Sequence, residues 1–335
     1  MRIKQNRRDF LGAAASAVAA GVLGGRPSFA DEGPPEVTTI RLSFTTGICF
    51  APLDVAEAFL RAEGFTDVQY VRAAGGFNAP QMIAEGEMDF GSSFAGTVVY
   101  HLDAGLPITA VRGLHVVCYE LFAREPILSI SDLKGRRVGI QTLASSGHLY
   151  LSIMATHVGL DPNEDIEWVV PPDGKAMEAF AAGETDAFLG FPTEPQELRA
   201  RGFDRVIVNT VSDRPWSQYF CCMIYGNRAW VRDHPVATKR FLRAVFKAAE
   251  FCQADPEHAA RRLVDGGFTQ KYDYALQTIR ELPYDLWHEY DSEDSMRFYG
   301  LRLHEAGMLR TSPNRLLAEG ADWRFVNELK RELKA

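Results

Sequence analysis

Hydrophobic residues in the first half of the chain change twice from a strand-like run to helical spacing. Each time, a β-type run is followed by a loop of small residues, a helical pattern and a second strand. These segments are 38–44, 45–52, 53–63 and 68–72 in the first unit, and 137–140, 141–147, 148–158 and 166–170 in the second. The chain thus repeats one β-loop-α-β unit, which predicts an α/β fold.

Each unit continues into a short helix that ends at a Gly-Glu-x-Asp turn, at 86–89 and at 183–186. Glycine suits the end of a helix because it adopts positive φ without steric cost. A strand of small residues follows each turn and ends in a loop, at 91–95 and at 190–195. Open α/β sheets place ligands at the carboxyl ends of their strands, so we expect both loops at a binding site.

The chain then crosses back through 206–208 and 213–216 to a cysteine-containing strand at 219–225, and it becomes mainly helical towards its end. Roughly 300 residues exceed the size at which a single core keeps growing, which predicts two lobes. We expect lobe 1 to consist of 37–123 plus 217–335, and an inserted lobe 2 to consist of 124–216. Hinges are expected near 122–128 and 211–216, where the chain passes between the lobes.

Residues 1–30 predict a cleaved signal peptide. A basic start leads to the pair Arg7-Arg8, and the apolar run at 11–25 is too short to anchor in a bilayer. Ser28 and Ala30 supply the small residues of a cleavage site. The layout is similar to a twin-arginine leader, which predicts export to the periplasm. A basic tail before a buried helix is the alternative, and the glycines of the run disfavour it.

Charge and cysteine content narrow the function. Removal of the leader takes the formal net charge from −8 to −12, which disfavours nucleic-acid binding. The five cysteines lack C-x-x-C spacing and are odd in number, so no disulfide framework is expected. Cys221 and Cys222 are interpreted as small apolar residues of a buried strand, with a reactive or metal-binding pair as the alternative. The sequence shows no metal-ligand spacing and no cofactor motif, so neither a metal nor a cofactor is expected.

Two similar α/β lobes behind an export leader resemble the type II periplasmic solute-binding proteins of ABC importers. Residues 131–140, followed by 145–148, are similar to the second-lobe opening of the nitrate/sulfonate/taurine branch, which also contains binding proteins for thiamine pyrimidine precursors. The resemblance covers nearly the whole mature chain. It implies that each lobe is a mixed sheet flanked by helices, with the ligand cleft between the lobes. It also implies a monomer that delivers a small-molecule solute to ABC permease and ATPase subunits.

The helix that starts at Ser145-Ser146-Gly147 offers free N–H groups, hydroxyls and a positive dipole end, which suit an anionic or polar ligand group. An ordinary serine N-cap is the alternative. Small polar residues of lobe 1 would face this helix when the lobes close. The expected ligand-binding residues are Thr45, Thr46, Ser92, Ser93, Ser145, Ser146, His148, Glu194, Trp216 and Tyr219.

Glu194 complicates a sulfonate or nitrate site. A carboxylate repels an anion and accepts hydrogen bonds from an amine, an amidine or an aminopyrimidine. Aromatic residues near the predicted loops would form a stacking slot for a flat solute, although each is alternatively a core residue. These residues are Phe50, Phe94, Phe191, Trp216 and Tyr219. The sequence therefore favours a heteroaromatic solute with one polar end, and leaves a sulfonate-like solute open.

An enzyme is the second hypothesis. It would make His148 a general base beside Ser145 and Ser146. Pyrimidine-synthesising relatives of the branch carry a Cys-rich stretch in the corresponding region, which is reduced here to Cys221 and Cys222. No catalytic triad, Schiff-base lysine or metal cluster can be assembled from the sequence, so an enzyme is not expected. A binding subunit of a sensor is the third hypothesis, and it has the same sequence features.

Overall fold

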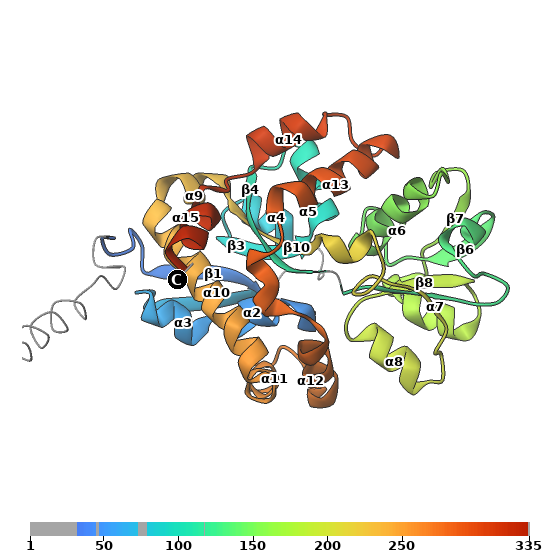
Figure 1. Cartoon of the computed structure of the whole chain (residues 1–335), viewed down its shortest axis with the longest axis horizontal. Helices are drawn as coiled ribbons and strands as arrows, with labels where there is room; N and C mark the ends of the chain where they lie inside the picture. Colours follow the sequence, from blue (N-terminus) through green and yellow to red (C-terminus); the bar gives the residue numbers. More distant parts are fainter. Residues whose placement is uncertain (1–31, 45–46, 73–78, 117, 334–335) are drawn as a thin grey trace, which may run out of the picture.

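The computed structural model describes residues 32–44, 47–72, 79–116 and 118–333. The expected signal peptide, Thr45 and Thr46 lie outside the described residues. Two five-stranded sheets form the centres of two lobes (Figure 1). The strands are β1 Thr39–Phe44, β2 Asp67–Arg72, β3 Phe90–Phe94, β4 Ile108–Val116, β5 Glu120–Ala123, β6 Arg136–Gly139, β7 Ile166–Val169, β8 Ala187–Gly190, β9 Val206–Asn209 and β10 Phe220–Asn227.

The two sheets have the same topology. The first has the order β2-β1-β3-β10-β4 and the second has the order β7-β6-β8-β5-β9. In the first, β1 is parallel to β2 and β3, while β10 is antiparallel to β3 and β4. In the second, β6 is parallel to β7 and β8, while β5 is antiparallel to β8 and β9. The repeat in the sequence therefore corresponds to two equivalent mixed sheets, which confirms the expected α/β fold class.

Helices flank both sheets, and those after β10 return to the first lobe (Figure 1). None of the helices in the described ranges has the length and apolar content needed to cross a membrane. The α-helices are α2 Ala51–Asp54, α3 Glu57–Ala62, α4 Ala79–Ala84, α5 Ala95–Asp103, α6 Ser146–His157, α7 Ala176–Ala182, α8 Glu194–Ala200, α9 Arg228–Asp233, α10 Pro235–Ala254, α11 Pro256–Asp265, α12 Tyr272–Glu281, α13 Ser292–Glu305, α14 Pro313–Gly320 and α15 Arg324–Leu333.

The first crossing between the sheets lies earlier than the sequence predicted. Residues 120–123 were assigned to lobe 1, but they form β5, which pairs with β8 and β9 of the second sheet. The reason is that 108–123 is mostly apolar and has no turn signal of Pro or Asn, so the sequence does not separate β4 from β5. The expected hinge at 122–128 is misplaced for the same reason, since its first residues lie inside a paired strand. The return crossing lies between β9 and β10, and the lobe boundary at 216/217 stays a prediction.

The repeated Gly-Glu-x-Asp turns have one structural role in both lobes. Gly86 and Gly183 adopt φ of +79° and +82° at the ends of α4 and α7. The aspartates that follow bind the equivalent strand of their own sheet, β1 or β6: Asp89 accepts from the Arg41 backbone N–H at 2.7 Å, and Asp186 accepts from the Arg137 N–H at 2.9 Å. The guanidinium of the same arginine pairs with the second carboxylate oxygen in each case.

We expect Asp89→Ala to lower the free energy of unfolding more than Asp186→Ala. The side chain of Asp89 is 3% exposed, whereas that of Asp186 is 27% exposed. Loss of a buried charge-assisted bond costs about 1.5–3 kcal/mol, and water compensates part of this loss at an exposed site. Urea unfolding of both variants measures the difference, with Asp204→Ala, whose side chain is exposed, as the control. Equal losses at the two turns would contradict this account.

Candidate functional site

A cavity of about 570 Å³ lies between the two sheets. Strands β1, β2, β3, β6 and β8 all contribute residues at or just beyond their carboxyl ends, which is where an open α/β sheet places a ligand. The first lobe and the crossing contribute Phe44, Gly47, Cys49, Phe50, Arg72, Ala79, Pro80, Ser92, Ser93, Phe94, Thr97, His101, Cys118, Tyr119, Cys222 and Tyr225. The second lobe contributes residues 139–147, Leu151, Phe188, Leu189, Phe191 and Glu194.

Five of the ten predicted site residues line this cavity, and they come from both lobes. They are Ser92, Ser93, Ser145, Ser146 and Glu194. His148, Trp216 and Tyr219 are not among the lining residues. The remaining two, Thr45 and Thr46, lie outside the described residues, although their neighbour Gly47 lines the cavity.

The start of α6 serves both as a capped helix end and as a wall of the cavity. Ser145 is the N-cap, and its hydroxyl accepts the His148 backbone N–H at 3.4 Å. The Ser146 hydroxyl lies 3.1 Å from the Thr97 hydroxyl of α5, which belongs to the other lobe. Ser145 is therefore both an N-cap and a cavity-lining residue, and Ser146 takes part in a contact between the lobes.

The sequence predicted that His148 contacts the ligand, but the structure places its side chain outside the cavity lining. Its Nδ1 accepts the Ala144 backbone N–H at 3.1 Å, and its ring packs edge-on against Trp168. Burial lowers the pKa of His148 to about 4, so the ring is uncharged at neutral pH. The side chain thus closes the loop before α6 and is not among the residues that face the cavity.

Trp216 and Tyr219 pack against α13 instead of the cavity. Trp216 is 2% exposed and contacts Tyr150 and Phe298 edge-on. Tyr219 stacks on Phe298, with ring centroids 4.0 Å apart. Since Phe298 lies about eighty residues further along the chain, the local sequence around 216–219 did not indicate this burial. The other predicted aromatic residues, Phe50, Phe94 and Phe191, do line the cavity.

Glu194 is the first residue of α8 and the acidic side chain of the cavity wall. Its carboxylate accepts the Phe191 backbone N–H at 3.0 Å. Burial raises the pKa of Glu194 to about 7, despite the stabilising bond from Phe191. The carboxyl group therefore changes between a neutral donor and a charged acceptor near physiological pH.

Sequence reasoning missed Arg72, Thr97 and Gln141, which bring further polar groups to the cavity. The Arg72 guanidinium lies 3.6 Å from the centroid of the Phe44 ring, a cation–π contact that holds a positive charge at this wall. A signal was present for two of them, because Arg72 ends β2 and Gln141 follows β6 closely. Applying the carboxyl-end rule to every strand of the repeat would have included both.

The chain is similar to known proteins in sequence and in fold. Residues 50–259 match the family described as NMT1/THI5 like. The chain belongs to the NMT1/THI5-like family. A Candida albicans (strain WO-1) relative named 4-amino-5-hydroxymethyl-2-methylpyrimidine phosphate synthase is 19% identical over 243 residues, which cover 67% of this chain and 70% of the relative.

Solved structures show the same fold. The periplasmic nitrate-binding protein NrtA from Synechocystis PCC 6803 superposes with a TM-score of 0.76 at 16% identity, covering 90% of each chain. The alkanesulfonate-binding protein SsuA from Xanthomonas axonopodis pv. citri, bound to MOPS, superposes with a TM-score of 0.67 at 16% identity. That match covers 86% of this chain and 99% of SsuA. At this level of identity, these structures establish the periplasmic-binding-protein fold.

Proposed function

We propose that this chain is the periplasmic substrate-binding component of an ABC importer, which captures a small polar or heteroaromatic solute by closure of its two lobes. The observation that carries the proposal is the cavity between the sheets, because loops at the carboxyl ends of strands from both lobes line it. Contacts between the lobes border it, including the 3.1 Å approach of Thr97 and Ser146. A solute held there would touch both lobes, so it would bind the closed arrangement more tightly than an open one.

The side chains of the cavity favour an organic solute with a flat body and polar ends. Arg72 and the start of α6 offer positive charge or N–H donors, while Glu194 offers a carboxyl group. Aromatic rings from both lobes supply stacking surface between these groups. Anionic solutes of the nitrate or sulfonate kind suit Arg72 and α6, whereas an aminopyrimidine or amine suits Glu194 in its charged form.

An enzyme of the pyrimidine-precursor-synthase type is the alternative, and the name of the Candida relative supports it. This alternative needs His148 as a general base. The position of His148 does not favour that role, because its ring accepts a hydrogen bond from the Ala144 N–H and does not line the cavity. Recovery of a bound solute unchanged after denaturation separates a binding protein from an enzyme. A sensor subunit would differ only in its partners, so the discovery of genes for an ABC ATPase and permease beside this one would support transport.

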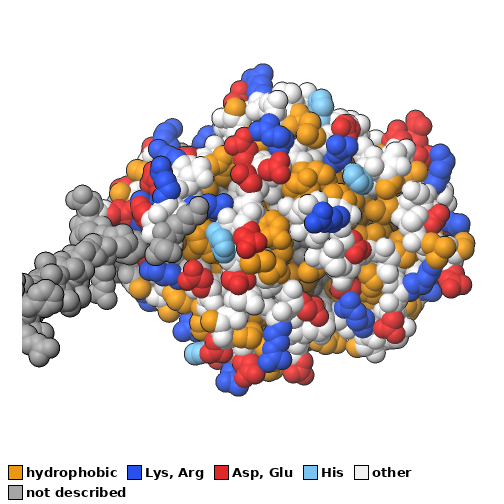
Figure 2. Space-filling view, viewed as in Figure 1, with side chains coloured by type: hydrophobic (Ala, Val, Ile, Leu, Met, Phe, Trp, Pro, Cys, Tyr) orange, Lys and Arg blue, Asp and Glu red, His pale blue; other side chains and the backbone are white. Residues whose placement is uncertain are grey.

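We place the mature protein in the periplasm as a monomer, delivered by the twin-arginine route. On the face shown in Figure 2, basic and acidic side chains are interspersed, in keeping with a partner other than nucleic acid. Replacing Arg7-Arg8 by Lys-Lys is expected to retain the precursor in the cytoplasm, as fractionation and immunoblotting would show. Periplasmic accumulation at the normal rate would contradict the twin-arginine assignment.

Gly47→Leu tests the position of the binding site. A Cβ at Gly47 would lie 2.8 Å from the Phe50 ring and 2.9 Å from the Phe191 ring of the other lobe. We expect the larger side chain to push the Phe50 and Phe191 rings apart when the lobes close, and to lower solute affinity by about tenfold or more, since overpacking of the closed form costs about 1–3 kcal/mol. Native mass spectrometry with an alkyl sulfonate, nitrate, an aromatic amine and an aminopyrimidine measures binding.

Gly33→Leu is the matched control, because a Cβ at Gly33 has no neighbour within 4 Å. The proposal expects at least one solute to bind the wild-type chain and the Gly33→Leu variant one-to-one, with its mass unchanged. Equal binding to Gly47→Leu, or conversion of the bound solute, would count against it.

A further inference from the structure

Three potential metal ligands meet in the core beside the cavity. The ligand atoms of Cys49, His115 and Cys222 all lie within 4.8 Å of one another, and all three residues are buried. Cys49 belongs to the 3-10 helix Ile48–Phe50, His115 to β4 and Cys222 to β10. Because they come from three elements far apart in the sequence, no sequence motif predicts that they lie together.

The His115 ring is oriented as a metal-binding histidine is. Its Nδ1 lies 2.5 Å from the Val116 carbonyl oxygen, which can only accept, so Nδ1 carries the proton and donates. The other nitrogen, Nε2, then presents a lone pair, and it is buried without a hydrogen-bond partner among the described residues. A backbone carbonyl that fixes the tautomer in this way is the usual outer support of a metal-bound imidazole.

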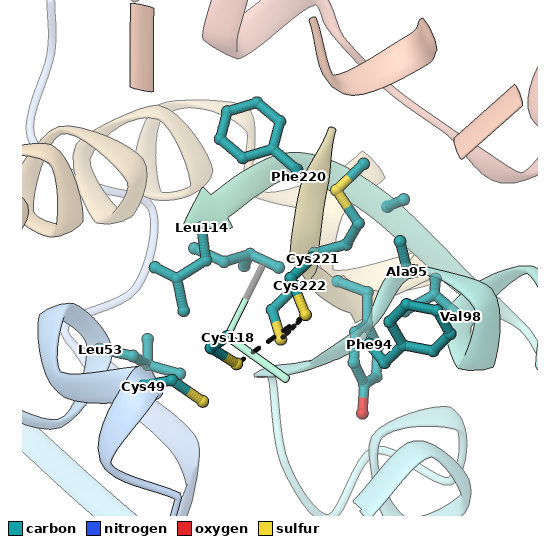
Figure 3. Close-up of a cluster of buried hydrophobic side chains, with 14 of the residues drawn as sticks. Cys49, Leu53, Phe94, Ala95, Val98, Leu114, Cys118, Phe220, Cys221 and Cys222 are labelled. Atoms are coloured by element: carbon teal, nitrogen blue, oxygen red, sulfur yellow. Dashed lines mark hydrogen bonds between the residues drawn. The ribbon is translucent and has the colours of Figure 1, made fainter. Parts of the chain in front are cut away.

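Four free cysteines, Cys49, Cys118, Cys221 and Cys222, lie close together in this part of the core (Figure 3). Cys221 Sγ lies 4.0 Å from Cys118 Sγ and 3.6 Å from Cys222 Sγ, and neither contact is a disulfide. Cys49 is held in place by Tyr284, whose hydroxyl donates to the Cys49 carbonyl at 3.2 Å. Cys221 and Cys118 thus place two further sulfur atoms beside Cys222.

The group also opens towards the cavity. Cys49 and Cys222 both line it, so the cavity is the shortest path by which an ion would approach these two cysteines. His115 is not among the lining residues, and all three side chains are nearly fully buried, with exposed fractions of 1–2%. An ion bound by these three residues would have protein ligands on its inner side and a free position on the cavity side.

We propose that Cys49, His115 and Cys222 bind one thiophilic divalent ion, Zn²⁺ by their chemistry, with the fourth ligand position open to the cavity. Two cysteines and one histidine with an open position form a known type of zinc site. In a tetrahedral site two sulfur atoms and one nitrogen lie about 3.5–3.8 Å apart, as Zn–S and Zn–N bonds of about 2.3 and 2.0 Å require, so the side chains must move closer. Oxygen-seeking ions such as Mg²⁺ and Ca²⁺ do not match this donor set.

The net charge of the buried site is zero both before and after the ion binds. Zn²⁺ displaces one proton from each of the two thiols, and both protons pass to solvent. The two thiolates balance the two positive charges of the ion, while His115 binds as the neutral imidazole. The loaded site therefore carries no net charge, which lowers the cost of placing the ion in the core. This proposal depends on the thiol group alone and does not require the transport role.

Co²⁺ serves as the first probe, because its thiolate complexes absorb in the near ultraviolet. The full chain, reduced and freed of metal by a chelator, is titrated with Co²⁺ alone. The proposal expects a thiolate-to-cobalt band that saturates at one ion per chain and disappears when Zn²⁺ is added. Absence of this band in the wild-type chain would overturn the proposal without any variant.

Variants then locate the ion. Cys49→Ser and Cys222→Ser are each expected to lower Co²⁺ and Zn²⁺ affinity at least tenfold, and His115→Gln is expected to shift or weaken the band. Cys252→Ser is the matched control, since Cys252 is also buried but lies on α10 and lines neither the group nor the cavity. An equal loss in Cys252→Ser would overturn the assignment. If a ligand variant does not fold, the Tm of the wild type is measured with and without Zn²⁺. A Zn²⁺-dependent rise in Tm that Cys252→Ser retains supports the proposed metal site, and the absence of a rise overturns it.

Discussion

The double substitution Thr97→Cys and Ser146→Cys is expected to slow the exchange of bound solute by roughly a hundredfold under oxidising conditions. The two hydroxyl oxygens are 3.1 Å apart and belong to α5 and α6 of different lobes. Cysteines at these positions place their sulfur atoms close enough for a disulfide with a small shift of either helix. The disulfide would hold the lobes together, so solute inside could not leave and solute outside could not enter.

Stopped-flow displacement of a fluorescent or isotopically labelled solute measures the exchange rate. Each single cysteine variant is the control for the chain's own thiols, all five of which are buried. A reductant should restore wild-type exchange in the double variant. Exchange at the wild-type rate in the oxidised double variant, with the disulfide verified by mass spectrometry, would contradict closure over the cavity.

Glu194→Gln is expected to change affinity in a direction that reveals the solute class. For an amine or aminopyrimidine, the substitution removes a charge-assisted acceptor and should weaken binding by about tenfold to a hundredfold, since such a bond contributes about 1.5–3 kcal/mol. For a sulfonate or carboxylate, it removes a repulsion, and affinity should stay equal or increase. Calorimetric titration with one solute of each class gives the sign.

The pH dependence supplies a second test of Glu194. Its pKa is raised to about 7, so the carboxyl group is neutral below that pH and charged above it. Affinity for a cationic solute should therefore rise with pH through about 7, whereas affinity for an anionic solute should fall. Glu194→Gln should abolish this dependence, while Glu178→Gln, which removes a neighbouring charge, should retain it. A pH dependence that is unchanged in Glu194→Gln would assign it to another group.

The repeated part of the fold was predictable because its signals are local. Strand runs, helical spacing and the two Gly-Glu-x-Asp turns located β1, β2, β6 and β7 to within about two residues at each end. The sequence did not separate β4 from β5, because both strands are mostly apolar and the change of sheet depends on pairing partners far along the chain. Pattern alone gives the elements, whereas pairing decides the sheet to which each belongs.

In the candidate site, too, the residues next to locally defined elements were predictable, and those whose position depends on distant elements were not. Ser145, Ser146 and Glu194 follow or begin elements that the sequence defines, and all three line the cavity. Trp216 and Tyr219 were misplaced because α13, which covers them, is distant in the sequence. His115 had no signal, since its neighbours in space come from two other elements.

The radius of gyration of the wild-type chain, measured by small-angle X-ray scattering with and without a bound solute, tests the central claim most directly. The account predicts a smaller radius at saturation with a solute that native mass spectrometry shows to bind. It also predicts that the oxidised Thr97→Cys/Ser146→Cys variant has this smaller radius without solute. An identical radius with and without saturating solute would contradict capture by closure of the two lobes.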